Sequence, residues 1–142
     1  MPLALAAYWF LSPRVNRAEF LLAALAALPL AYALTRLAGL LYSHEQPFAA
    51  GAFAPLIPHE IDNSFPSDHA ALAGAMAGVA GFYNRSLGML MWAVAVLVAL
   101  GRMFAGLHYP VDIAAGLILG GLCAVASFYC VHSYFSARLH TN

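Results

Sequence analysis

The sequence contains no lysine and little charge of either sign. Its six arginines balance six acidic residues, and charged residues make up 8% of the 142 positions. Soluble domains usually carry about 25% charged residues. Here 63% of the residues are hydrophobic and the mean hydropathy is +0.79, which excludes an ordinary soluble domain and predicts an integral membrane protein. The net charge of zero gives no indication of a nucleic acid or of an acidic partner.

Cysteine is also scarce. Cys123 and Cys130 lie seven residues apart in one apolar run. This spacing places both thiols near one face of a helix, so we predict two buried thiols rather than a disulfide or a metal pair.

The N-terminus has no pattern typical of a cleavable signal peptide. Residues 1–10 are apolar, but no basic segment precedes them and no small-residue cleavage site follows. Such a run is shorter than the roughly 20 residues that span a membrane. We interpret it as an interfacial segment, or as the tail of a first helix whose beginning belongs to a longer chain.

Long apolar runs fill most of the remaining sequence. We predict four main helices, each long enough to cross a membrane with some tilt, at residues 18–41, 67–83, 87–105 and 110–135. Glycines four residues apart, at 74 and 78 and again at 116 and 120, predict close contacts between helices. The expected fold is an all-α, polytopic membrane helical bundle with about four main transmembrane helices and a short N-terminal apolar segment. No linker or repeat divides the chain, so we expect one domain over residues 1–142.

The arginines predict the orientation of this bundle. If each predicted helix crosses the membrane, four of the arginines lie on one side: Arg14, Arg17, Arg85 and Arg138. The positive-inside rule makes that side cytoplasmic. The loop at residues 42–65 then faces the periplasm or exterior of the inner (plasma) membrane. Arg102 is a basic residue on the outer side, as expected of a ligand for an anionic substrate.

The predicted second helix begins with three polar residues. Ser67 follows a proline and is a good N-cap, and Asp68 and His69 occupy the first turn. The free amides and the positive end of the helix dipole form a site for an anion, to which the Ser67 hydroxyl adds a donor.

A second polar group spans the end of the third predicted helix and the start of the fourth. Arg102, His108 and Asp112 are spaced by six and four residues. Arg102 offers a planar, charged fork suited to phosphate oxygens. Asp112 lies within reach to accept a hydrogen bond from the His108 ring, which would leave the other ring nitrogen free as a nucleophile or base.

These residues resemble the motifs of the type 2 phosphatidic acid phosphatase superfamily. Pro66-Ser67-Asp68-His69 resembles its Pro-Ser-Gly-His motif, with Asp68 in place of glycine. The spacing of Arg102, His108 and Asp112 matches the third motif, with Gly101 in place of serine. The run from Asn63 to His69 is especially similar to bacterial undecaprenyl-diphosphatases. The resemblance covers residues 36–120.

The first motif of that family, a lysine followed after six residues by Arg-Pro, is altered here. Gln46 stands where the arginine is expected, and Gly39 stands where the lysine is expected. Arg36 lies one helical turn before Gly39 and could present its charge on the same face. His44 is a second candidate for replacing the missing charge.

The resemblance implies a metal-independent lipid phosphatase that needs no cofactor and acts on a lipid diphosphate, with undecaprenyl diphosphate as the favoured substrate. It implies that His108 attacks phosphorus, that His69 protonates the leaving oxygen, and that Asp112 orients His108. The expected substrate-binding residues are Arg102, Ser67, Asp68, Arg36, Gln46 and His44.

Three alternatives stay open at this point. Phosphatidic acid or phosphatidylglycerophosphate could replace the diphosphate as substrate. The altered first motif also permits a non-catalytic lipid-binding or lipid-moving protein. A third possibility is an engineered or truncated chain, because the short N-terminal run looks like the end of a helix. Zinc is not expected, because no compact ligand motif such as H-E-x-x-H is present. We interpret the other polar residues of the loop, such as His59, Asp62 and Asn63, as ordinary loop or interface groups. Nothing in the sequence specifies an oligomeric state.

Overall fold

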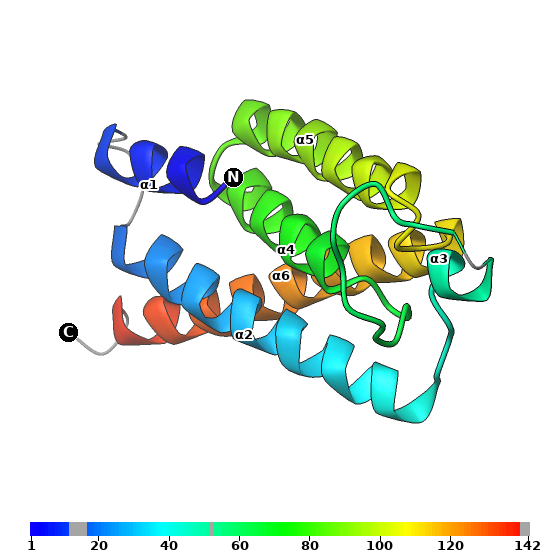
Figure 1. Ribbon diagram of the computed structural model, residues 1–142. Coiled ribbons are helices and arrows are strands. Elements are labelled where there is room, and N and C mark those ends of the chain that lie inside the picture. The colour runs from blue at the N-terminus through cyan, green and yellow to red at the C-terminus, as the bar shows by residue number, and fades with distance from the viewer. Residues whose placement is uncertain (12–16, 52, 140–142) are drawn as a thin grey trace.

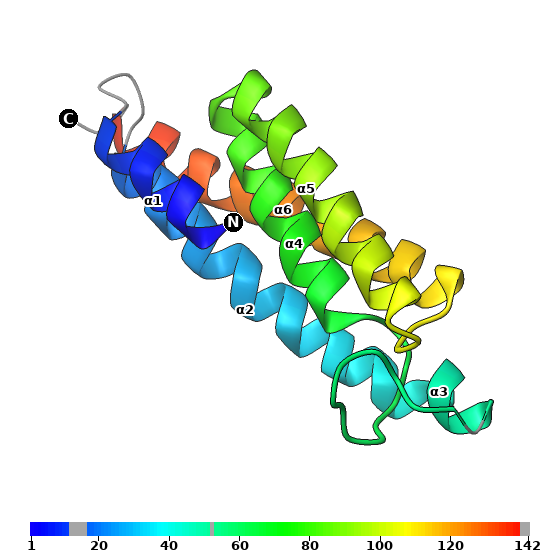
Figure 2. The same ribbon diagram turned by 45° about the horizontal axis from the view of Figure 1, so that its top comes forward.

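The computed structural model describes residues 1–11, 17–51 and 53–139, and within these ranges the regular structure is helical. The helices are α1 (Pro2–Leu11), α2 (Arg17–Leu41), α3 (Pro47–Ala50), α4 (Asp68–Tyr83), α5 (Arg85–Phe104) and α6 (Pro110–Leu139). The four long helices run side by side in a bundle, which confirms the predicted all-α architecture (Figures 1 and 2). Their bounds agree closely with the prediction. The largest difference is the end of α6, predicted at residue 135 and observed at 139.

Among the described residues, three helices are long and apolar enough to cross a membrane, namely α2, α5 and α6, whereas four were expected. The fourth long helix, α4, has 16 residues. At 1.5 Å per residue it rises about 24 Å, which is shorter than the roughly 30 Å of a bilayer core. It packs against α2, α5 and α6 in the centre of the bundle, so neighbouring helices rather than lipid surround much of its surface.

The centre of the bundle is built from small side chains. The buried residues of α4 are alanines, one glycine and one valine. A Cβ atom added at Gly74 would lie 2.8 Å from the carbonyl oxygen of Leu117 in α6, and one added at Gly116 would collide with the carbonyl of Ser67. Larger side chains at these glycines would force α4 and α6 apart. The predicted role of the spaced glycines in close helix contact is therefore confirmed.

The two cysteines do not share one environment. Cys123 is buried and Cys130 is exposed, and both are free thiols. The prediction of two buried thiols is therefore right for Cys123 and wrong for Cys130. Because α6 has 30 residues and α4 has 16, the last turns of α6 extend beyond α4 and lose its cover.

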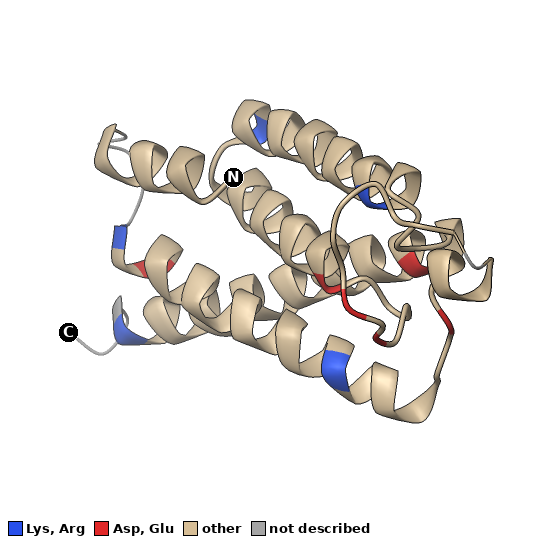
Figure 3. Cartoon of the chain, in the orientation of Figure 1, with Lys and Arg blue, Asp and Glu red and all other residues tan. Residues whose placement is uncertain are grey.

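The two ends of the bundle differ in charge. At one end α2 and α5 finish and α4 and α6 begin, and α3 and the loop at residues 53–67 lie at this end as well (Figures 1 and 2). The acidic residues gather at this loop end, apart from Glu19 in the first turn of α2 (Figure 3). The opposite helix ends carry Arg17, Arg85 and Arg138, as the predicted topology requires, while Arg14 lies outside the described residues.

Candidate active site

The turn between α5 and α6 brings His108 to the loop end of the bundle. Gly106 has a φ of 79°, the left-handed conformation that commonly ends a helix. The next residue, Leu107, is fully buried and anchors the turn. Pro110 then begins α6, a position that suits proline because the first helical amides need no partner within the helix.

The His108 side chain is held in one tautomer by the backbone. Its Nδ1 atom lies 2.9 Å from the carbonyl oxygen of Ser64. A carbonyl can only accept, so Nδ1 carries the proton and Nε2 carries the lone pair. The residue is 5% exposed, and within the described part of the chain Nε2 has no hydrogen-bond partner. This arrangement presents Nε2 as a nucleophile or base.

The carboxylate of Asp112 contacts His108 through Ser64 rather than directly. Asp112 is 0% exposed and accepts hydrogen bonds from the Ser64 hydroxyl at 2.6 Å, the Tyr109 amide at 2.8 Å and His44 Nδ1 at 3.0 Å. The expected direct bond between Asp112 and the His108 ring was therefore wrong. The carboxylate folds back onto the first turn of α6, and the loop places Ser64 between the two side chains.

The surroundings of His108 favour its neutral ring. Burial lowers the pKa of His108 below its ordinary value of 6.5, because it removes the charged form from water. The Ser64 carbonyl partly offsets this by stabilising the charged ring, and the positive charge of Arg102 lowers the pKa further. A neutral ring keeps the lone pair on Nε2.

Ser67 caps the start of α4. Its hydroxyl accepts a hydrogen bond from the Ala70 amide at 3.4 Å, which confirms the predicted N-cap. The Ser67 amide donates to the carbonyl of Asp112 at 3.1 Å, and the side chain is fully buried. Ser67 is not among the residues that line the pocket described below, so the structure does not bring its hydroxyl to the expected substrate position.

The next two residues, Asp68 and His69, form a pair. Asp68 Oδ1 lies 2.8 Å from His69 Nδ1 and accepts the His69 backbone amide at 2.7 Å. The carboxylate therefore fixes the orientation of the His69 ring and leaves its Nε2 available. Both residues line the pocket.

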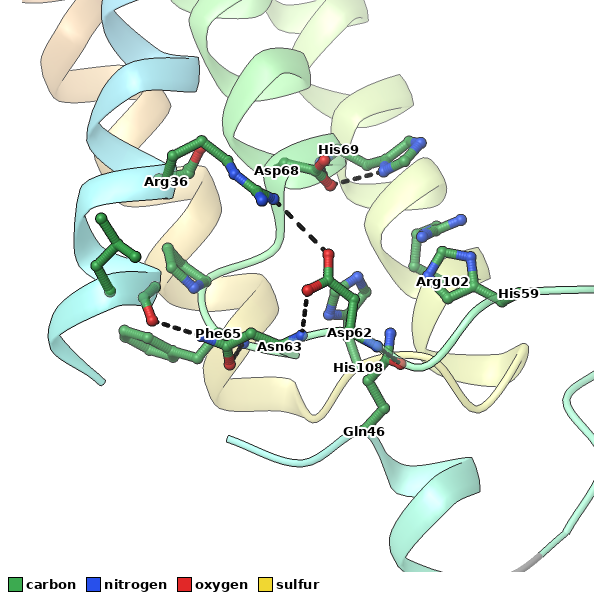
Figure 4. Close-up of a pocket in the computed structure, with 14 residues that line it drawn as sticks. Arg36, Gln46, His59, Asp62, Asn63, Phe65, Asp68, His69, Arg102 and His108 are labelled. Carbon is green, nitrogen blue, oxygen red and sulfur yellow. Dashed lines mark hydrogen bonds and ion pairs between the residues drawn. The ribbon is translucent and has the colours of Figure 1, made fainter. Parts of the chain in front are cut away.

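A pocket of about 290 Å³ lies beside these side chains at the loop end of the bundle (Figure 4). It is lined by residues from α2, the loop, α4 and α5, together with His108: Thr35, Arg36, Gly39, Leu40, Gln46, His59, Asp62, Asn63, Phe65, Pro66, Asp68, His69, Arg102 and His108. Among the described residues, the buried Nε atom of Arg102 has no hydrogen-bond partner. A pocket with two cationic side chains and a free imidazole nitrogen is suited to an anionic group such as phosphate.

The candidates for the altered first motif occupy different places. Arg36 lines the pocket, with its guanidinium 3.7 Å from the carboxylate of Asp62 (Figure 4). Gln46 also lines the pocket, and its side-chain oxygen accepts the Asp62 amide at 3.0 Å. His44 is not among the lining residues and instead contacts Asp112 behind His108. Of the two cationic candidates, Arg36 is the one in the pocket.

Three loop residues have larger roles than the sequence indicated. His59 lines the pocket (Figure 4). Asn63 donates to the carbonyl of Gly39 in the last turn of α2 and to that of Tyr42 just after the helix, and it accepts the His44 amide. Ser64 joins His108 to Asp112. The similarity of the run beginning at Asn63 to undecaprenyl-diphosphatases was a signal for Asn63 and Ser64, whereas nothing in the sequence singled out His59.

Several histidine and acidic side chains lie at this end of the bundle, and such side chains can bind metal ions. Across residues 1–11, 17–51 and 53–139, no group of three or more histidine, cysteine, aspartate or glutamate side chains is arranged to hold a metal ion.

Comparison with known proteins identifies relatives over most of the chain. The bacitracin transport permease protein BcrC of Bacillus licheniformis is 38% identical over 130 residues, which are 91% of this chain and 64% of that protein. The undecaprenyl-diphosphatase BcrC of Bacillus subtilis is 35% identical over 120 residues, 82% of this chain and 60% of that protein. The chain thus spans less than two thirds of the length of these relatives.

The fold is also found in a solved structure. The crystal structure of Aquifex aeolicus LpxE superposes with a TM-score of 0.74 at 24% identity, covering 90% of this chain and 74% of that one. The sequence matches the PAP2 superfamily over residues 20–136, a range that includes every residue of the pocket. On this match, and with three helices able to cross a bilayer, the chain is a multi-pass membrane protein that belongs to the PAP2 superfamily.

Proposed function

We propose that the protein is a metal-independent membrane phosphatase that converts undecaprenyl diphosphate to undecaprenyl phosphate and inorganic phosphate. The observation that carries the proposal is His108, which lines the same pocket as Arg102 and Arg36. Its Nδ1 is fixed by a carbonyl, and among the described residues its Nε2 has no hydrogen-bond partner. Family membership supports the reaction type, and the name of the B. subtilis relative supports the substrate.

In the proposed mechanism His108 is the nucleophile. Its Nε2 lone pair attacks the terminal phosphorus of the diphosphate in line with the bridging oxygen, and the bond from phosphorus to that oxygen breaks. His69 donates a proton to the departing oxygen, so that lipid monophosphate leaves. Water then attacks the phosphohistidine and gives a proton to His69. The bond from Nε2 to phosphorus breaks, which releases phosphate and restores both histidines.

The charges around the pocket stabilise the transferring group. The buried Nε of Arg102 has no partner in the part of the chain that the structure describes, and it offers a donor to the non-bridging phosphate oxygens, where negative charge spreads in the transition state. Asp68 and His69 bring the first turn of α4 to the pocket, where the helix adds the positive end of its dipole. Asp68 holds His69 in place for proton transfer.

Arg36 is expected to bind the second phosphate of a diphosphate. We predict that Arg36→Gln raises KM for undecaprenyl diphosphate about tenfold with a smaller change in kcat, because a charge-assisted hydrogen bond from a half-exposed arginine is lost. Asp62→Asn, which removes the competing carboxylate, should lower KM. Steady-state assays check both. Arg85→Gln, at the opposite end of α5, is the matched control, and an Arg36→Gln variant with the KM of the control would contradict the assignment.

The lowered pKa of His108 predicts a pH dependence. The ring must be neutral to attack, and it stays neutral until the pH falls through its pKa, which lies below 6.5. We therefore expect the acid limb of the kcat/KM profile to lie below pH 6.5. Initial rates across the acid range, each followed by re-assay at neutral pH to exclude unfolding, measure the limb. A limb at or above the ordinary histidine value would contradict a neutral, buried nucleophile.

The positive-inside rule supports an orientation with the pocket on the outer face. Arg17, Arg85 and Arg138 belong to the opposite helix ends, which would then be cytoplasmic. In this orientation the enzyme would act on diphosphate exposed to the periplasm or exterior. Accessibility of a cysteine introduced in the loop to an impermeant reagent in intact cells tests the orientation.

Two other functions are separated from this one by a substrate comparison. In the first, phosphatidic acid or phosphatidylglycerophosphate is the substrate and the same histidine acts on a different lipid. In the second the protein is a transporter, as the name of the B. licheniformis relative says of that protein, and no hydrolysis is needed. Phosphate release from each of the three lipids in detergent decides among them. A higher kcat/KM for the diphosphate supports the proposal. Preference for either monophosphate lipid contradicts the substrate assignment, and release from none contradicts the phosphatase assignment.

A further inference from the structure

Two loop segments pair with each other next to His108 and Asp112. The Ser64 amide donates to the His44 carbonyl at 2.7 Å, and Glu45 and Asn63 form an antiparallel bridge. This pairing holds the side chains of His44 and Ser64 beside Asp112. Neither side chain is among those that line the pocket, so neither is placed to touch a substrate there.

A continuous chain of hydrogen bonds runs through these residues to His108. His44 Nδ1 lies 3.0 Å from Asp112 Oδ1, the Ser64 hydroxyl lies 2.6 Å from Asp112 Oδ2, and the Ser64 carbonyl lies 2.9 Å from His108 Nδ1. An ionised carboxylate only accepts hydrogen bonds, so the Ser64 hydroxyl and His44 Nδ1 are the donors. Each link therefore has a fixed direction.

We infer that His44 and Ser64 are positioning residues that act on His108 through Asp112 and the Ser64 backbone. The inference rests on the proposed phosphoryl transfer and assigns to His44 a role other than substrate binding. The chain holds the proton on His108 Nδ1, although a free histidine side chain in water favours a proton on Nε2. It thereby keeps the Nε2 lone pair available for attack.

The burial of Asp112 explains why His44 matters for this arrangement. A fully buried carboxylate needs donors for both oxygens, and His44 supplies the side-chain donor to Oδ1. Without that donor the carboxylate would turn toward another partner, which weakens its bond to the Ser64 hydroxyl. The Ser64 carbonyl would then lose its fixed position against His108.

The same chain also stabilises the reaction intermediate. When Nε2 bonds to phosphorus, the imidazole ring gains positive charge. The Ser64 carbonyl accepts from the ring at Nδ1, and the negative charge of Asp112 lies one hydroxyl away. This stabilisation appears in the reaction rather than in binding, so loss of the chain should lower kcat more than it changes KM.

Two substitutions of His44 separate hydrogen bonding from packing. The His44 ring also stacks on Tyr109, with centroids 4.6 Å apart and planes 18° from parallel. His44→Asn keeps a donor near the position of Nδ1 and loses the stacked ring. His44→Phe keeps a ring and loses the donor. A packing role predicts the larger loss in His44→Asn, whereas the inferred role predicts the larger loss in His44→Phe.

We expect Ser64→Ala and His44→Phe to lower kcat about tenfold to a hundredfold with little change in KM, and His44→Asn to stay within about threefold of the parent protein. Steady-state assays normalised to protein that remains folded in detergent measure this. Ser64→Ala is the smaller change, because it removes a hydroxyl and retains the backbone carbonyl. It therefore tests the inference even if His44→Phe does not fold. An unchanged kcat in Ser64→Ala, or equal losses in the two His44 variants, overturns the inference.

A second readout keeps this inference separate from the proposed function. Nitrogen NMR of histidine-labelled protein reports the tautomer of His108 without any turnover. We expect the Nδ1-protonated form in the parent protein and a mixture of tautomers in Ser64→Ala and His44→Phe. An Nε2-protonated His108 in the parent, or a tautomer that no variant changes, overturns the inference. A protein with the expected tautomers that hydrolyses none of the three lipids refutes the proposed function alone.

Discussion

Replacing His108 is expected to abolish phosphate release from undecaprenyl diphosphate. The loss in kcat should exceed about 10⁴-fold, because the variant lacks the nucleophile and not merely a group that assists it. His108→Asn is the sharper variant, since its amide can still donate to the Ser64 carbonyl while nothing replaces Nε2. Initial-rate assays of purified protein in detergent measure the effect.

The control for this prediction is the folded state of the variant. His108→Asn should match the parent protein in gel filtration and in thermal unfolding, because the hydrogen bond at the Nδ1 position is kept. His108→Ala should also be inactive, although it leaves the Ser64 carbonyl unpartnered. Retention of more than a small part of the parent rate by folded His108→Asn would exclude His108 as the nucleophile.

Substitution of Arg102 is expected to give the second large effect. Arg102→Gln should lower kcat roughly 10²- to 10³-fold, the usual cost of losing one donor that stabilises a transition state. Its Nε is buried and, among the described residues, unpartnered, which is consistent with a donor reserved for a ligand. The kcat of Arg102→Lys should fall between those of Arg102→Gln and the parent protein, because lysine restores the charge without the planar fork. Comparison of kcat for the three proteins measures the effect.

Arg85→Gln is the matched control for Arg102→Gln. Both arginines belong to α5, with Arg85 at its first residue and Arg102 in its last turn. The Arg85 variant should keep the parent kcat, since that end of the helix lies away from the pocket. If Arg102→Gln affects KM and leaves kcat unchanged, Arg102 contributes to ground-state binding and does not stabilise the transition state.

The helices could be predicted from the sequence because a long apolar run in a bilayer must satisfy its backbone hydrogen bonds internally, and a helix does this. The convergence of His69, Arg102 and His108 could also be predicted. Successive helices that alternate in direction bring the start of α4, the end of α5 and the start of α6 to the same end of the bundle. The central position of α4 was harder to predict, because its alanines and glycines are apolar enough for lipid and small enough for close packing.

The details of the site depended on contacts that no local pattern encodes. Ser67 resembles a phosphate ligand by its motif, yet it is buried as the cap of α4. His44 was expected in the pocket, but the pairing of its segment with Ser64 turns it toward Asp112. The position of His44 is set by a hydrogen bond between loop segments 20 residues apart, whereas sequence reasoning predicts loops from nearby residues alone.

The measurement that most directly tests the central claim is the trapping of phosphate on His108. The purified chain is mixed with undecaprenyl diphosphate labelled in its terminal phosphate, with excess chelator present, and quenched rapidly in alkali, where phosphohistidine is stable. The account predicts label bound to His108 in the parent protein, lost on mild acid treatment and absent from His108→Asn. Turnover without any labelled protein, or turnover that the chelator abolishes, would contradict it.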